Sequence, residues 1–437
     1  MRMNEKRGQI ALFIILGIVL MLIIGLVIYI SYKGKSSEAI PGRTTVSERF
    51  EPIQLFVEDC IASVAREAIE KLGKHGGYID PNDVYLSGRL FDVNNQDQTE
   101  NDLLYLSKDI EKAIPYWLYS YDYTGCDNCL ILSQAPYLDE IERQISIYVS
   151  ENIDYCLENL EQFIKQGYEI KSASTLYANT IIRDKDVFVT AIYPINVTYK
   201  NEKTTIERYE AIVDIPLLKY YELAINITAR QYNSQFLEGL TTYILLSHSG
   251  LDYSLLPPWY AYSSQYSVVM WSKTSVKNTI NQLLLSYMPL MQVKGAKNYH
   301  QIRSNNLTLL EKNFIDLITL DLFPDRDLKN TEISFLYMGE DLYFDIQPSK
   351  DELLGPFENY GIGSDYSFAP PEKSNLYQFF YDISYPVIVE IRDEYKPGQI
   401  YTFMFALETN IKQNLPLKEW WNESKKAFIS RFFIIFF

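Results

Sequence analysis

The chain has 437 residues, a formal net charge of −16 and a hydrophobic fraction of 47%. A chain this apolar, with 14% aromatic residues, is not disordered throughout, because it can bury enough surface to offset the entropy of ordering. Its acidity excludes a nucleic-acid-binding protein, since phosphates repel a negative body. The length exceeds that of a typical single core, so we expect two structural units.

The first element along the chain is an apolar run from Ile10 to Tyr32, which contains no charged side chain. At about 1.5 Å per residue, a helix of this length can cross a hydrocarbon core of about 30 Å. The run is longer than the apolar part of a secretory signal peptide, and no Ala-x-Ala cleavage pattern follows it. We therefore predict a transmembrane helix at residues 10–32 in contact with membrane lipid, a short cytoplasmic or leader segment at residues 1–9 and a polar tether at residues 33–50.

The residues before this run are Arg7-Gly8-Gln9-Ile10-Ala11. They resemble the class III signal segment of archaeal type IV pilin-like proteins. The resemblance implies that a peptidase cuts after Gly8, that Gln9 begins the mature chain, and that the helix stays in the membrane or packs in a filament. Many such pilins have an acidic residue at the fifth mature position, where this chain has Phe13. The layout also looks like large single-pass surface proteins of genome-reduced archaea.

Three features indicate that the body is extracytoplasmic. Residues 1–35 have a net charge of +4, so the rest of the chain carries −20. A body of this charge is repelled by anionic lipid surfaces. Four cysteines permit two disulfides in an oxidising compartment. There are also Asn-x-Ser/Thr triplets, which are candidate glycosylation sites, at Asn196, Asn226, Asn306 and Asn422.

Two helical stripes follow the tether. Apolar residues recur at spacings of three and four from Val57 to Leu72, and again over about seven turns from Leu138 to Ile164. Each stripe contains one cysteine, and each ends at glycine. We therefore prefer a Cys60–Cys156 disulfide between two packed helices, which would stabilise the fold by roughly 4–5 kcal/mol through loop closure.

The spacing of apolar residues then changes to the alternation of strands, and the second half of the chain repeats the order of helices followed by strands. Strands are predicted at 169–184, 186–199 and 204–215, followed by a long helix at 217–247; then come helices at 274–293 and 307–321 and strands at 331–346, 376–393 and 399–411. The stretch from Tyr193 can be aligned with that from Tyr385, since both have Tyr-Pro, an alternating strand, a charged turn and a return strand. The second turn is expected to be longer by about two residues.

These elements predict an α+β protein: one N-terminal transmembrane helix and a body of two related helix-plus-antiparallel-sheet units. The units are placed at residues 51–250 and 251–437. The chain ends in RFFIIFF from Arg431, which fits a buried strand, the start of something longer or a truncated reading frame. The 36 tyrosines suit either a binding surface or ordinary tyrosine-rich strands.

Cys126-Asp127-Asn128-Cys129 is the sharpest local motif. A small structural disulfide loop is the preferred interpretation, because the preceding stretch is loop-like rather than a strand leading into a helix. A redox pair, and a four-cysteine zinc site with Cys60 and Cys156, are the alternatives.

The remaining polar motifs do not predict a catalytic, metal or cofactor site. His75, His248 and His300 lack the i, i+4 spacing of a helical metal site, and no Gly-x-Ser-x-Gly elbow accompanies Ser247-His248-Ser249. The carboxylate pairs Asp184/Asp186 and Asp325/Asp327 lie in turn-like stretches, where hydrogen bonding within the turn is the usual role.

The sequence thus predicts a membrane-anchored extracytoplasmic surface protein with a binding or structural role, partnered by other surface proteins. A pilin-like filament subunit is the first alternative. A membrane-anchored thiol-disulfide oxidoreductase is the second.

Overall fold

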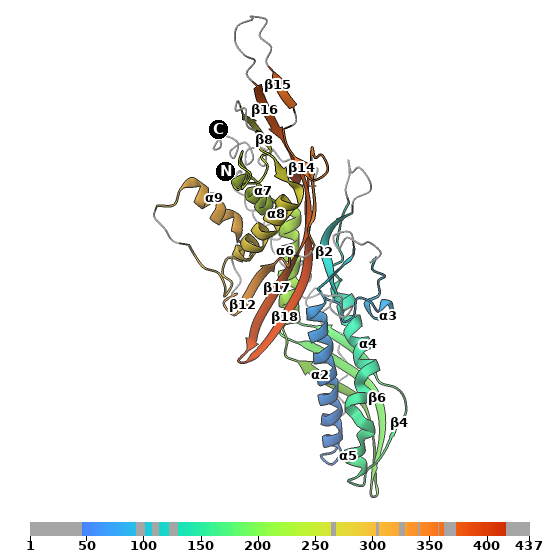
Figure 1. Ribbon diagram of the computed structural model, residues 1–437. Helices are drawn as coiled ribbons and strands as arrows, with labels where there is room; N and C mark the ends of the chain where they lie inside the picture. The colour runs from blue at the N-terminus through green and yellow to red at the C-terminus, as the bar shows by residue number, and fades with distance from the viewer. Residues whose placement is uncertain are drawn as a thin grey trace, which may run out of the picture.

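The computed structural model describes residues 46–92, 101–106, 113–121, 130–263, 268–302, 306–322, 328–339, 341–356, 358–361 and 373–416. The molecule is an elongated mixed α/β protein (Figure 1). A smaller sheet with two long helices forms its lower end in this view. A larger sheet with further helices fills the middle, and a small three-stranded sheet lies at the upper end.

The lower end is a helix pair packed on a four-stranded antiparallel sheet. The long hairpin β6 (Val187–Tyr199) and β7 (Glu202–Val213) is its centre, and β4 (Glu169–Ser172) and β5 (Tyr177–Ile182) pair with the other side of β6. The helices are α2 (Glu51–Lys74) and α4 (Leu138–Leu157), and their apolar stripes are buried. Alternating side chains of the strands, such as Val187, Val189 and Ala191, complete this core.

The larger sheet has eight strands and is built around a second long hairpin, β17 (Phe380–Lys396) and β18 (Gln399–Lys412). β12 (Thr331–Leu336) and β13 (Tyr343–Gln347) pair with β17, and β2 (Ala113–Tyr121) and β19 (Leu415–Pro416) pair with β18. β1 (Leu103–Tyr105) and β3 (Leu130–Leu132) extend the sheet beyond β2.

The remaining helices and short strands lie in both parts of the molecule. At the lower end, the 3-10 turn η3 (Glu158–Leu160) and α5 (Glu161–Ile164) follow α4, and α3 (Val84–Ser87) packs on α4. The other helices are α6 (Leu217–Ser234), α7 (Phe236–Ser247), α8 (Lys273–Tyr287) and α9 (Leu309–Ile318), with the 3-10 turn η4 (Met288–Leu290). The short strands are β8 (Tyr260–Ser263), β9 (Trp271–Ser272), β10 (Gln292–Val293), β11 (Thr319–Leu320), β14 (Leu353–Leu354), β15 (Glu358–Gly361) and β16 (Lys373–Gln378).

One hydrophobic core joins the lower end to the larger sheet. Near its C-terminus α2 lies so close to β18 that a side chain at Gly73 would meet the Thr402 carbonyl oxygen only 2.4 Å from its Cβ. The Tyr401 hydroxyl donates to the Ile69 carbonyl oxygen at 2.9 Å, and the Tyr401 ring stacks on Tyr220 of α6. Only glycine permits this approach of helix and strand.

The structure corrects the membrane part of the predicted fold class. Among the residues described, from Val46 onward, no helix combines the length and apolar character needed to cross a membrane. The longest of these helices, α2, carries charged side chains such as Glu51, Lys71 and Lys74. The predicted transmembrane helix at residues 10–32 lies outside the described residues, so single-pass membrane localisation is not supported and plays no part in the function proposed below.

The prediction of separate antiparallel sheets is also wrong. β2 comes from the first half of the chain and pairs in parallel with β18 from the second half, so the larger sheet is mixed. The stretch at residues 113–121 lacks the polar alternation of a half-exposed strand because its described side chains, at residues 113–119, are all buried. The boundary between residues 250 and 251 stays a prediction.

Two local expectations are corrected as well. Both long hairpins close through two residues, at positions 200–201 and 397–398, so the second turn is not longer. The predicted helix at 217–247 is two helices, because Gln235 adopts a left-handed conformation with φ of 49° between α6 and α7.

The predicted continuous helix from Leu138 to Ile164 is likewise broken. Glu158, Asn159 and Leu160 have φ values of 42°, 54° and 58°, so three consecutive residues are left-handed. A left-handed conformation costs about 1–2 kcal/mol for each residue that carries a Cβ, with asparagine the best tolerated. The break lets Phe163 become buried, whereas Ile164, which the helical stripe placed in the core, is 48% exposed.

Candidate functional site

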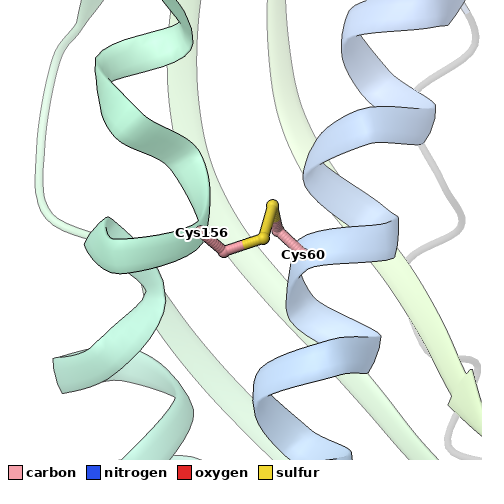
Figure 2. Close-up of a disulfide and its surroundings, with 2 residues drawn as sticks. All are labelled: Cys60 and Cys156. Carbon is pink, nitrogen blue, oxygen red and sulfur yellow. A yellow bond between two sulfur atoms is a disulfide. The ribbon is translucent and has the colours of Figure 1, made fainter.

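The predicted disulfide is present and joins the two helices of the lower end. Figure 2 shows Cys60 on α2 and Cys156 on α4 bonded across the gap between the helices, with their Cα atoms 5.5 Å apart. Cys60 is 1% exposed, whereas Cys156 is only partly buried. The bond closes 96 residues of chain, which is a loop length at which cross-linking removes much entropy from the unfolded state.

A ladder of side-chain hydrogen bonds ties α4 to the edge of the lower sheet. Ser150 Oγ accepts from the backbone N–H of Ala178 at 3.0 Å, and Ser146 Oγ accepts from that of Thr180 at 3.0 Å. Glu142 Oε1 accepts from the N–H of Ile182 at 2.8 Å. These rungs fit because four helical residues rise about 6.0 Å and two strand residues span about 6.6–6.8 Å.

The last rung of this ladder carries a perturbed carboxyl group. Burial raises the pKa of Glu142, and the N–H of Ile182 opposes that shift by stabilising the carboxylate. The ladder supplies acceptors for backbone N–H groups of β5 that could otherwise pair with another strand. Its function is therefore structural: it closes the edge of β5 with residues of the same chain.

Side-chain amides also form hydrogen bonds with backbone N–H and carbonyl groups. Asn298 lies beside the free edge of β12, where its Oδ1 accepts from the Ile333 N–H at 3.2 Å and its Nδ2 donates to the Ile333 carbonyl at 2.9 Å. Each of these amides offers the donor and the acceptor that a neighbouring strand residue would supply. The other amides of this kind are Gln144 with Gly77 and Ile79, Gln292 with His300, and Asn414 with Phe379 and Tyr381.

A buried carboxylate, Asp393, connects helix α6 to two strands of the larger sheet. Its Oδ2 accepts from Lys219 Nζ at 3.0 Å and from the Tyr220 hydroxyl at 2.8 Å, and its Oδ1 accepts from Thr331 Oγ1 at 2.6 Å. Lys219 also donates to Thr331 Oγ1 at 2.9 Å. Burial raises the pKa of Tyr220, and the Asp393 charge raises it further, so the phenol stays a donor. The donors to Asp393 hold α6, β12 and β17 together.

Each of the three histidines has its own hydrogen-bond partners. His75 Nδ1 lies 3.1 Å from the Ile79 carbonyl oxygen, and the His300 backbone N–H donates to Gln292. His248 Nδ1 lies 3.1 Å from Ser247 Oγ, and its Nε2 lies 3.3 Å from the Tyr287 hydroxyl. Ser247 donates to the Tyr243 carbonyl at 2.6 Å, so this hydroxyl is engaged as a helix side chain normally is.

The carboxylate pairs and cysteines complete the list of predicted polar sites. Asp186 forms an ion pair with Arg183 at 2.5 Å within its turn. The part of the chain that the structure describes contains no group of three or more side chains able to hold a metal ion. Cys126, Cys129 and the pair Asp325/Asp327 lie outside the described residues.

Three of the four glycosylation candidates can be placed. Asn196 is exposed on β6, where its Oδ1 accepts from Thr205 Oγ1 at 2.8 Å, and Asn306 is exposed just before α9. Asn226 is exposed within α6, where its amide donates to the Glu222 carbonyl and the hydroxyl-bearing Thr228 is buried. The candidate Asn422 and the leader residues Gly8 and Gln9 lie outside the described residues.

The upper end of the molecule exposes many large apolar side chains. We call this set the apolar end; its members are 41–82% exposed, and they are Tyr253, Leu255, Tyr260, Tyr262, Val268, Met270 and Leu353. Tyr253 and Leu255 lie in the segment between α7 and β8, and the others belong to β8, to β14 and to the segment leading into β9. Figure 1 shows β8 and β14 in the upper part of the molecule. Neither motif nor periodicity in the sequence pointed to them.

A buried tryptophan holds this region in place. The Trp271 indole N–H donates to the carbonyl oxygens of Asp252 and Leu255 at 3.0 and 2.9 Å, and its ring packs edge-on against Tyr377 and Phe379. Because side chains alternate along a strand, burying Trp271 turns Met270 outward.

The same alternation applies to the neighbouring strands of the apolar end. In β14, Leu354 pairs with Trp271 and is buried, so Leu353 is presented to solvent. In β8, Ala261 lies opposite the buried Tyr377, so Tyr260 and Tyr262 face outward. The exposed apolar residues are therefore mounted on an ordered scaffold.

The tyrosines differ widely in burial. Tyr116, Tyr209 and Tyr385 are buried in the core, whereas Tyr253, Tyr260 and Tyr262 are exposed.

No known protein family, no curated protein and no solved structure matches this chain.

The sequence analysis missed the ladder residues Glu142, Ser146 and Ser150, although their spacing of four beside the apolar stripe is visible in the sequence.

Proposed function

We propose that this protein has a non-catalytic binding role and that the apolar end is its contact surface for another protein. The observation that carries the proposal is the set of seven large apolar side chains that the strands and adjoining segments of this end present to solvent. Apolar side chains that are exposed together in one region favour an interaction site over the scattered single residues of an ordinary surface. Tyrosine and methionine are also enriched at the centres of protein interfaces.

The architecture of the rest of the molecule supports this role. The edges of β5 and β12 are closed by side chains of the same chain, and a disulfide joins the helices of the lower end. Such a body resists edge-to-edge pairing, so the apolar end is left as a surface suited to association. The charged groups with the most partners, such as Asp393, stabilise the body.

The proposal can be tested by site-specific photo-crosslinking in the organism that makes the protein. A benzophenone amino acid replaces Tyr260, Met270 or, as the control, Tyr155, which is 85% exposed on α4 far from the apolar end. We expect the same adduct of defined mass from positions 260 and 270 and none of it from position 155. The absence of an adduct at positions 260 and 270, or the same products at all three positions, would contradict the proposal.

A second variant checks that the surface itself binds. Tyr260→Ser combined with Tyr262→Ser removes two exposed rings without touching Trp271, so folding should be unchanged. We expect the adduct at position 270 to weaken by about tenfold, which corresponds to a combined loss of about 1.4 kcal/mol from two residues of a type enriched among the energetically important interface residues. Tyr155→Ser is the matched control and should leave the adduct unchanged.

A further inference from the structure

The two halves of α4 are held by different kinds of interaction. From Glu142 to Ser150 the helix is bonded to β5 through the side-chain ladder. Beyond Ser150 it is held by the Cys60–Cys156 disulfide and by buried apolar side chains, of which Ile153 and Leu157 belong to the core. The covalent bond therefore lies in the half of the helix that the ladder does not reach.

This lower half leads directly into the strained backbone. Cys156 is followed after one residue by Glu158, Asn159 and Leu160, the three left-handed residues. Glu158 and Asn159 are exposed, and only Leu160 of the three is buried. A left-handed run of this kind persists only when its surroundings hold it in place.

The turn positions an aromatic cluster against α2. Phe163 packs edge-on against Phe56, with ring centroids 5.6 Å apart, and against Tyr168 at 6.2 Å. Tyr168 in turn stacks on Tyr199 at the end of β6, with centroids 4.5 Å apart. Phe56 lies one helical turn from Cys60, so the disulfide and this cluster fix the same part of α2 to the same part of the chain.

We propose that the Cys60–Cys156 disulfide is a redox-controlled clamp on the lower half of α4. When oxidised, it holds the left-handed turn at residues 158–160 and keeps the Phe56–Phe163–Tyr168 cluster packed. When it is reduced, residues 151–168 open as a local unit and expose this cluster, while the ladder keeps residues 142–150 folded on β5. The reductant is a dithiol.

The chemistry balances as a two-electron exchange. One thiolate of the dithiol attacks Sγ of Cys156, which is the less buried of the two residues, and Cys60 leaves as a thiolate that takes up a proton. The second thiol of the reductant then displaces Cys156, which also becomes a thiol. The reductant is oxidised to a disulfide, and the protein gains two thiols.

Hydrogen exchange measured by mass spectrometry on the full chain, with and without dithiothreitol, tests the clamp. After reduction we expect exchange at residues 151–168 to become about tenfold faster, because opening is then limited by apolar contacts alone. Residues 142–150 and 178–182 should exchange as before. Unchanged exchange at residues 151–168, or an equal increase throughout the chain, would overturn the proposal.

Two cysteine variants assign the effect to the correct pair. In Cys126→Ser/Cys129→Ser only the clamp can be reduced, so the response of residues 151–168 to dithiothreitol must persist; its loss would overturn the proposal. In Cys60→Ser/Cys156→Ser the fast exchange should be present without reductant, and reductant should change nothing further in residues 151–168. If this variant fails to fold, the response of the first variant still decides the question.

Glycine substitutions test the strain separately. Glu158→Gly replaces an exposed left-handed residue with the one that tolerates this conformation best, so exchange in the reduced protein should be slower than in the reduced wild type. Glu151→Gly is the matched control at an exposed right-handed position of α4, where glycine should make exchange faster. If both variants exchange faster to the same extent, the strained turn does not drive the opening.

Discussion

The two long hairpins, β6–β7 and β17–β18, share a sequence pattern and a two-residue turn but occupy different environments. In β6–β7 one face lies on the helices and the other faces solvent, so residues such as Ile192 and Ile212 are about half exposed. In β17–β18 both faces are covered, and seven consecutive residues from Ile383 to Val389 are buried.

The spacing of apolar residues in the two hairpins reflects this difference in environment. Val187-Phe188-Val189-Thr190-Ala191 of β6 includes a polar residue on the outer face, as expected for a strand with one solvated side. Val387-Ile388-Val389 of β17 and Phe403-Met404-Phe405-Ala406-Leu407 of β18 are unbroken apolar runs, which are typical of strands buried on both faces. Similar hairpins can therefore be a surface layer or a central element, depending on the outer-face residues.

The largest expected contrast between the hairpins concerns aspartate. Asp393→Ala in β17 leaves Lys219, Tyr220 and Thr331 without their shared acceptor, so we expect it to destabilise the fold by about 3–5 kcal/mol. Asp214→Ala, just after β7, removes an exposed ion pair with Lys396 at 2.7 Å and should cost no more than about 1 kcal/mol. Urea unfolding of both variants measures the difference; equal costs would show that the Asp393 cluster is not structural.

The next contrast uses one substitution at two sites. Ile391→Ala in β17 removes a fully buried side chain and should cost about 2–5 kcal/mol, because the surrounding core cannot close the cavity completely. Ile212→Ala in β7, where the side chain is 52% exposed, should cost less than about 1 kcal/mol. Thermal and urea denaturation would measure both. Similar losses at the two positions would mean that the outer face of β6–β7 is covered in solution.

A smaller effect is expected at the edge of the β6–β7 sheet. Ser146→Ala removes the acceptor of the Thr180 N–H and should destabilise the fold by about 1–3 kcal/mol. Hydrogen exchange of the Thr180 amide should rise with it. Ser286→Ala is a matched control, since the Ser286 hydroxyl donates to the Gln282 carbonyl of its own helix, α8, at 2.8 Å. Unchanged protection of Thr180 would contradict the ladder.

The smallest effect concerns the surface that links the two helices over the β6–β7 sheet. Tyr148 donates to Glu67 Oε1 at 2.8 Å, Lys71 lies beside both, and these contacts lower the pKa of Glu67. A lowered pKa in the folded state stabilises the protein above the unfolded pKa, and this stability is lost as pH falls through the folded value. Because Glu67 is largely exposed, the loss should stay below about 0.5 kcal/mol.

This prediction is checked by comparing urea unfolding of the wild type and Glu67→Gln as the pH is lowered from neutral. The difference in stability between them should shrink as the wild-type carboxylate becomes protonated. A difference that grows toward low pH would contradict the assigned direction.

Much of the fold could be predicted because local patterns specify it. The helical stripes placed α2 and α4 and paired Cys60 with Cys156, and alternation placed β6, β7, β17 and β18 to within a few residues. The two hairpin turns, at Lys200-Asn201 and Pro397-Gly398, lie between the strands that alternation predicted. These features depend on residues close in sequence, so a single sequence contains them.

The features that were missed depend on distant residues. β2 lies beside β18 across almost three hundred residues of chain, and no local pattern reports such a parallel pairing. The break at residues 158–160 contradicts an apolar stripe that continues to Ile164. The apolar end is assembled from two segments, around residues 253–270 and at Leu353, and its exposure could not be distinguished from burial before the fold was known.

The amide of Asn298 carries a consequence for chemical ageing. Spontaneous deamidation converts an asparagine side chain to a carboxylate, which is an acceptor without a donor. At Asn298 this change would leave the Ile333 carbonyl facing another oxygen and would reopen the backbone edge of β12. Loss of this one amide nitrogen would thus leave a backbone acceptor of β12 without the donor that now occupies it.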